Sequence, residues 1–185
     1  MNADAVIIDG YVDEPACFGV PPYISPYIRT IAGVFLEHGF SPLYSTIDQL
    51  RKDPLRLHEF SSAKIVVMIS GVTVPGKYLG GTPATLTEIQ QIGRQIRGPT
   101  TLIGGPIGFG YSPQGGKKAI KQAISGFDHL LTGSPAEALD SFIATGNPAG
   151  VPDYQRSDRW AVGGSGIIRS HPSYPHVMCE LETAR

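Results

Sequence analysis

The apolar residues of the first 146 positions alternate between short continuous runs and repeats at helical spacing. Continuous runs bounded by turn residues are typical of strands buried on both faces of a sheet. Five such runs predict strands at residues 5–9, 43–47, 64–70, 100–103 and 129–131. The third run, KIVVMIS, is the richest in β-branched residues and is expected to be the central strand.

The intervals between these runs carry apolar residues at the spacing of one helix face. They predict helices at residues 25–38, 53–60, 85–96, 116–124 and 135–144. Gly39 follows the first helix as a natural stop, and Asp53 with Pro54 suits the cap and first position of the second. Alternating strands and helices imply a parallel sheet with right-handed crossovers. The predicted fold of residues 1–146 is therefore α/β, a doubly wound, flavodoxin-like five-stranded parallel sheet.

From Asn147 onward the apolar pattern gives way to polar sequence punctuated by glycine and proline. Residues 147–185 are accordingly interpreted as an irregular linker or strap that packs back on the domain. Trp160 and Tyr174 are the expected anchors of this strap.

Composition narrows the class of protein. The chain has 185 residues, enough for one domain with a substantial core, and a net charge of −1 with no basic run. That balance argues against nucleic acid or an anionic membrane as a partner. No apolar stretch approaches the roughly 18 residues that cross a bilayer, and the first residues do not resemble a signal peptide. Only two cysteines occur, which favours a reducing, cytoplasmic compartment and excludes a four-cysteine cluster or zinc site within the chain.

Unusually long, glycine-rich segments follow the predicted strands at their carboxyl ends, whereas the connectors at the opposite ends are short. In open α/β sheets, ligands bind beyond the carboxyl ends, where the strand order reverses. Long loops within a compact domain are usually functional. The sequence therefore predicts a small-molecule or cofactor site at this edge. The expected lining residues are Tyr11, Ser70, Gly71, Thr73, Gly104, Gly105, Pro106, Tyr111 and Gly133.

Other chemistry-bearing residues have simpler interpretations. Asp13 and Glu14 could be paired acid–base carboxylates, but an exposed turn before Pro15 is favoured. His171 and His176 are interpreted as hydrogen-bonding residues rather than as a metal pair, because no third ligand is evident. No residue is assigned a catalytic role, and the glycine-rich segments match neither a P-loop nor a dinucleotide-binding motif.

Two of the predicted turns are similar to those of cobalamin-binding domains. In that family a serine turn after the third strand and a Gly-Gly turn after the fourth embrace the nucleotide tail of the corrin, and Ser70 and Gly104-Gly105 match in order and context. The resemblance implies cobalamin as a cofactor, with Tyr11 and Tyr111 as walls to the corrin face. Many members also carry D-x-H-x-x-G after the first strand, whose histidine binds cobalt. Residues 9–14 contain no histidine, as in many radical S-adenosylmethionine (SAM) relatives.

Both ends of the chain extend this resemblance. Residues 7–33, IIDGYVDEPACFGVPPYISPYIRTIAG, resemble archaeal proteins of the Fe–S oxidoreductase family that join a cobalamin-type domain to a radical SAM domain. Glu182 and Arg185 form an E-x-x-R that looks like the lead-in to the cluster loop of radical SAM enzymes, without its three cysteines. The resemblance implies an accessory domain whose partner is a radical SAM domain. The [4Fe–4S] cluster and SAM would belong to that longer parent protein.

Two alternatives remain open at this stage. The same fold could serve as a structural docking module that binds no cofactor, with Tyr78, Phe109 and Tyr111 filling the strand-end crevice. The second alternative is a flavodoxin-like carrier of FMN. Acidic residues in the loop after the first strand, among them Asp13 and Glu14, disfavour it because they would repel a phosphate.

Overall fold

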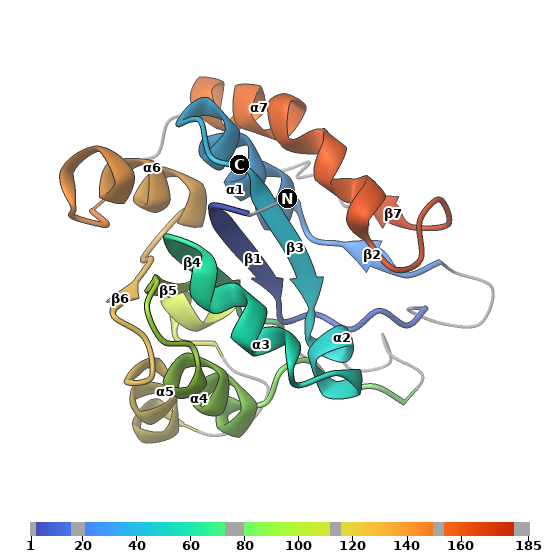
Figure 1. The fold of residues 1–185 in the computed structure, drawn as a ribbon, viewed down its shortest axis with the longest axis vertical. Coiled ribbons are helices and arrows are strands. Elements are labelled where there is room, and N and C mark those ends of the chain that lie inside the picture. Colours follow the sequence, from blue (N-terminus) through green and yellow to red (C-terminus); the bar gives the residue numbers. More distant parts are fainter. Residues whose placement is uncertain (1–2, 16–20, 73–79, 112–115, 150–153, 180–185) are drawn as a thin grey trace.

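The computed structural model describes residues 3–15, 21–72, 80–111, 116–149 and 154–179. Its main sheet contains five parallel strands in the spatial order β3-β1-β4-β5-β6 (Figure 1). The strands are β1 (Ala5–Asp9), β3 (Pro42–Thr46), β4 (Ile65–Ile69), β5 (Thr100–Gly104) and β6 (His129–Leu130). Numbered by their succession in the chain, the neighbours read 2-1-3-4-5, which is the flavodoxin-like order. The predicted fold class is confirmed, and the strand order reverses between β1 and β4.

Helices cover both faces of this sheet. One face carries α1 (Pro26–Glu37), α6 (Pro135–Thr145) and α7 (Tyr154–Gly163). The other carries α2 (Ile47–Lys52), α3 (Arg56–Glu59), α4 (Leu86–Gln95) and α5 (Lys117–Ile124). Three 3₁₀ turns complete the connections: η1 (Phe60–Ser62), η2 (Gly105–Phe109) and η3 (Gly164–Ser170). Among the described residues, no helix has the length and apolar character of a membrane span.

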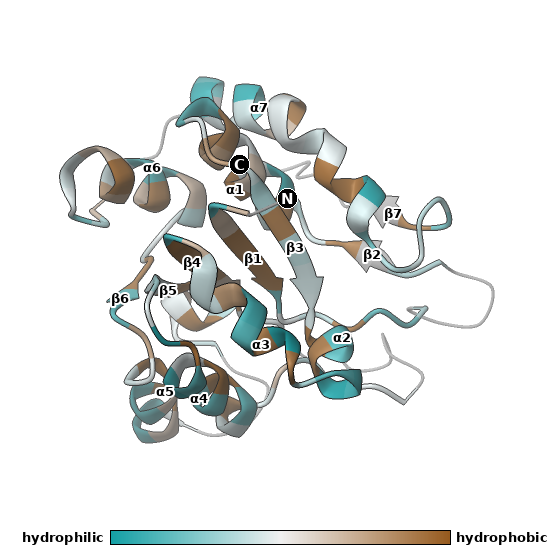
Figure 2. Ribbon diagram, viewed as in Figure 1, coloured by the Kyte–Doolittle hydropathy of each residue, from teal (hydrophilic) through white to brown (hydrophobic). Residues whose placement is uncertain are grey.

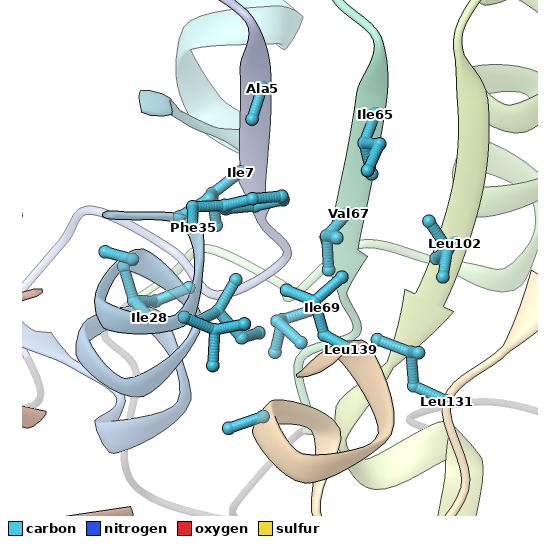
Figure 3. Close-up of a cluster of buried hydrophobic side chains, with 14 of the residues drawn as sticks. Ala5, Ile7, Ile28, Phe35, Ile65, Val67, Ile69, Leu102, Leu131 and Leu139 are labelled. Carbon is cyan, nitrogen blue, oxygen red and sulfur yellow. The ribbon is translucent and has the colours of Figure 1, made fainter. Parts of the chain in front are cut away.

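Alternating side chains of each strand enter the two cores. Ile7 of β1 and Val67 of β4 belong to the cluster of buried side chains beneath α1 and α6, which Figure 3 shows in close-up. Val6 and Met68 belong to the opposite cluster, beneath α2 to α5. Strands buried on both faces are predominantly apolar, and Figure 2 accordingly shows most of β1 in brown. The last residue of β1, Asp9, is the exception.

Helix boundaries follow their capping residues. Thr46 and Gln49 form a reciprocal capping box at the start of α2, and Thr85 and Glu88 form another at the start of α4. The first box begins a helix directly after β3, where the sequence predicted none. The helix predicted for residues 53–60 is correspondingly reduced to α3 and η1.

The segment expected as an irregular strap contains the regular helix α7, which lies alongside α1 (Figure 1). Trp160 is only 1% exposed, and its indole N–H donates to the Glu37 carboxylate at 2.8 Å. This expected anchor is confirmed, whereas Tyr174 is 49% exposed. Farther along, β7 (Met178–Cys179) pairs in parallel with β2 (Tyr23–Ile24) in a second, two-stranded sheet. The strap is thus held by both a helix contact and a strand contact.

Candidate functional site

Ser70 lies at the carboxyl end of β4, where the sequence places a ligand-binding hydroxyl. Its side chain is 1% exposed. The hydroxyl donates to the Gly104 carbonyl oxygen at 3.2 Å and accepts the Ile107 backbone N–H at 2.9 Å. A hydroxyl has one proton to donate, and that proton is used within the protein. Ser70 therefore ties β4 to the turn after β5.

The loops after β1 and β4 meet at the point where the strand order reverses. The Gly10 N–H donates to the Ile69 carbonyl oxygen at 2.7 Å, and the Ala84 N–H donates to the Gly10 carbonyl oxygen at 2.8 Å. A Cβ atom on Gly71 would lie 2.5 Å from the Gly10 oxygen and 2.7 Å from Cβ of Pro83. Such close approach is possible only between glycines. The loops after β1 and β4 are therefore in direct backbone contact at this point.

The Gly-Gly turn after β5 packs over the same point. Gly104, Gly105 and Pro106 are all buried. Gly105 has φ +80°, and a Cβ on it would lie 2.9 Å from the Ile69 side chain. The structure thus brings together Ser70 and the two predicted glycine turns, as expected, and packs them against one another.

The remaining predicted site residues are dispersed. Tyr11 is buried, whereas Tyr111 is 66% exposed and Gly133 is also exposed. Thr73 lies outside the described residues, as does Tyr78. Among the residues proposed to fill the crevice, Phe109 is instead 53% exposed. Phe109 and Tyr111 present two aromatic rings at the edge beyond β5.

A cluster of titratable side chains lies beside this edge, at the carboxyl ends of β1 and β3. Asp9 is buried and accepts the Tyr44 hydroxyl at 2.9 Å and the Tyr11 backbone N–H at 3.0 Å. Burial disfavours the carboxylate and raises the pKa of Asp9 to about 7, although both hydrogen bonds act in the opposite direction. Burial also raises the pKa of Tyr44 well above its ordinary value. Asp9 therefore titrates near neutral pH, where an ordinary aspartate is fully ionised.

Asp13 extends the cluster, and the prediction that it lies in an exposed turn is wrong. Its side chain is 12% exposed, with Oδ2 accepting the Thr46 hydroxyl at 2.8 Å. Its backbone N–H donates to Asp48 at 2.8 Å. Burial raises the pKa of Asp13 to about 6. The other oxygen, Oδ1, is buried and has no hydrogen-bond partner among the described residues.

His171 covers Asp13 from the strap. Its ring is buried, and Nδ1 accepts the Ser173 backbone N–H at 3.1 Å, which assigns the proton of the neutral ring to Nε2. Nε2 lies 3.9 Å from Asp13 Oδ1. Burial lowers the pKa of His171 to about 4, so the two groups are not a charged pair at neutral pH. The expectation of a hydrogen-bonding role for His171 is confirmed.

The cluster holds separate segments of the chain together. Asp9, Asp13 and His171 join the β1 loop, the end of β3 and the strap, but their polar atoms are covered by protein. In the described part of the chain, no group of three or more acidic, cysteine or histidine side chains is arranged to hold a metal ion. An open groove of about 490 Å³ lies next to it. Its lining residues are Pro15, Pro21, Pro22, Pro172, Ser173, Tyr174 and His176.

Replacing His171 with alanine should lower the pKa of Asp13 from about 6 toward the value of an exposed carboxyl. The imidazole contributes to the burial that raises this pKa, and its removal admits water to Oδ1. A carbon-13 NMR titration of the Asp13 carboxyl would measure the change. His176→Ala, which removes an exposed ring from the groove, is the matched control and should leave Asp13 unchanged. An unaltered Asp13 titration in His171→Ala would show that His171 does not contribute to the raised pKa of Asp13.

Comparison with known proteins gives relatives but no function. No protein-family model matches the chain, and no solved structure matches it. An uncharacterized protein of Archaeoglobus fulgidus is 35% identical over 181 residues, which is 98% of this chain and 32% of the relative. An uncharacterized protein of Methanocaldococcus jannaschii is 32% identical over an alignment that covers 100% of this chain and 35% of the relative. The chain thus spans about a third of the length of these curated relatives.

Proposed function

We propose that this chain is an accessory domain of a longer protein, with a fold of the cobalamin-binding type in which the protein itself fills the cofactor crevice. The observation that carries the proposal is the hydrogen bonding of Ser70. Its hydroxyl is occupied by Gly104 and Ile107, at the position where a cobalamin-binding domain would use a serine turn for the nucleotide tail. The contact between Gly10 and Gly71 supports the same conclusion.

The proposed companion is a radical SAM domain. Support comes from the resemblance of residues 7–33 and of the E-x-x-R at Glu182 and Arg185, and from relatives about three times as long as the region aligned. The cluster and SAM would carry the radical chemistry, and this domain would help to close the active site. Phe109 and Tyr111 are suited to anchoring such a contact, because exposed aromatic rings dominate many protein interfaces.

Metal analysis tests both parts of the proposal. The Archaeoglobus relative would be purified anaerobically, reconstituted with iron, sulfide and hydroxocobalamin, and freed of unbound cofactor. We expect about four irons per chain, the content of one [4Fe–4S] cluster, and no stoichiometric cobalt. In parallel, this chain would be titrated with hydroxocobalamin, and its visible spectrum should equal the sum of the two components.

Cobalt binding and iron content test the two parts of the proposal separately. One cobalt per chain, or a shifted corrin spectrum with this chain alone, would show that the crevice opens to cobalamin and would overturn the closed-crevice proposal. Absence of iron from the reconstituted relative would instead remove the radical SAM companion. A circular dichroism spectrum of each preparation distinguishes these results from a failure to fold.

A further inference from the structure

Glu14 reaches across the carboxyl edge of the sheet, from the loop after β1 to the segment that leads into α4. One carboxylate oxygen, Oε1, accepts the backbone N–H of Gly80 at 3.1 Å and that of Gly81 at 2.6 Å. Glu14 itself is only half-buried. Two successive amides that converge on one oxygen form an arrangement that proteins use to bind anions.

The space beside the Gly81 Cα is occupied by the Glu14 carboxylate. A Cβ atom on Gly81 would lie 3.0 Å from both Cδ and Oε1 of Glu14 and 3.3 Å from the Val12 side chain. Contacts this short require the carboxylate to shift by a few tenths of an ångström. Glycine at position 81 lets the carboxylate approach the amides without that shift.

Arg51 places a cation beside the same backbone. Its guanidinium donates to the Thr82 carbonyl oxygen at 2.8 Å, directly after Gly81, and also pairs with Asp48 and Glu88 at 2.8 Å each. These two carboxylates offset the charge of Arg51. A free anion at the amides would consequently depend mainly on the two N–H groups, and we expect it to bind weakly.

The position of the amides gives them a function beyond joining two loops. They lie beyond the carboxyl end of β4, next to the reversal of strand order, where ligands of this fold bind. We propose that Gly80 and Gly81 form an oxyanion site that Glu14 occupies as a built-in ligand. An incoming carboxylate or phosphate would take the place of Glu14 and release the loop after β1 from the segment before α4.

The test is to remove the Glu14 carboxylate and to add phosphate or acetate in its place. Proton–nitrogen NMR spectra of wild type, Glu14→Gln and Glu14→Ala would be followed during titration with sodium phosphate and, separately, with sodium acetate. In Glu14→Ala we expect saturable shifts of the Gly80 and Gly81 amides. Wild type should respond only at clearly higher anion concentrations, because the anion must there displace Glu14. Glu14→Gln should respond weakly, because its carboxamide oxygen still accepts the two N–H groups.

Glu59→Ala is the matched control, since it removes an exposed carboxylate from α3, away from this site. It should behave like wild type. A response to both anions, or to phosphate alone or acetate alone, supports the site and identifies the preferred group. No saturable shift in Glu14→Ala, in a spectrum that otherwise shows a folded protein, would overturn the proposal. Equal binding by wild type would also overturn it, because Glu14 would then not be an occupant.

Discussion

Replacing Gly33 with alanine should destabilise the protein by at least about 3 kcal/mol, because the backbones of α1 and α7 touch at this residue. A Cβ atom on Gly33 would overlap the carbonyl group of Trp160 and lie 2.6 Å from its Cα. Gly164, which follows α7, makes a similar contact, since its Cβ would overlap the Arg29 carbonyl oxygen. Backbone atoms cannot rotate away as a long side chain can. The alanine methyl would have to separate the two helices.

Separation of α7 from α1 would expose the Trp160 indole and break its hydrogen bond to Glu37. Trp160 is the only tryptophan of the chain, so its fluorescence reports this contact directly during urea unfolding. Gly163→Ala is the matched control. Gly163 is the last residue of α7, its φ is −59°, and no atom lies within 4 Å of an added Cβ. That variant should be unchanged or stabilised by up to about 1 kcal/mol. Equal stability of the two variants would contradict the close helix contact.

Replacing Asp9 with asparagine should alter the dependence of stability on pH. The pKa of Asp9 is raised from 3.8 to about 7 on folding, so the folded state holds a proton that the unfolded state releases. The resulting stabilisation is fully present below about pH 4 and is lost as the pH rises through 7. Asparagine has no such titration. The unfolding free energy of Asp9→Asn relative to wild type should therefore increase by roughly 3 kcal/mol between pH 5 and pH 8.

Groups that do not interact with Asp9 shape the absolute profile but cancel in this comparison, whereas the charge of Asp13 also contributes to the raised pKa of Asp9. Asp13, with its pKa raised to about 6, loses stabilisation in the same direction as Asp9. His171, with its pKa lowered to about 4, acts oppositely, since its neutral folded form is penalised as the pH falls below 6.5. Urea unfolding at intervals between pH 5 and pH 8 would measure the difference, with Asp4→Asn as a half-exposed control just before β1. A constant difference between Asp9→Asn and wild type would show that Asp9 does not hold this proton.

The parallel sheet could be predicted because its determinants are local. Runs such as residues 65–69 are apolar at every position, which identifies a doubly buried strand without knowledge of its neighbours. Helix α7 could not be found in this way. Its sequence, YQRSDRWAVG, is largely polar, and it is held by the backbone contact with Gly33 and by burial of Trp160. Both interactions depend on the position of α1 in the folded chain.

In the candidate site, too, features set by local sequence could be predicted, and features set by contacts between distant segments could not. The sequence correctly predicts Ser70 at the end of the central strand, but the partners of its hydroxyl depend on η2, which begins at Gly105 and brings the Ile107 N–H to it. The sequence favours an exposed Asp13, because it shows no pocket that would desolvate this carboxyl. The group that covers it, His171, comes from the far end of the chain. A carboxyl with a raised pKa can be predicted from sequence only when the residues that bury it lie near it in the chain.

The short pairing of β2 with β7 connects the strap to the start of α1. Ile24 is bonded into this pair, and only Ser25 separates it from Pro26, the first residue of α1. A pull on β7 would be passed through β2 to α1, and a tilt of α1 would in turn displace α7 along its glycine contact. The two-stranded sheet therefore joins the end of the described strap directly to the start of α1, in addition to the contact that His171 makes with Asp13 beside the strand ends of the main sheet.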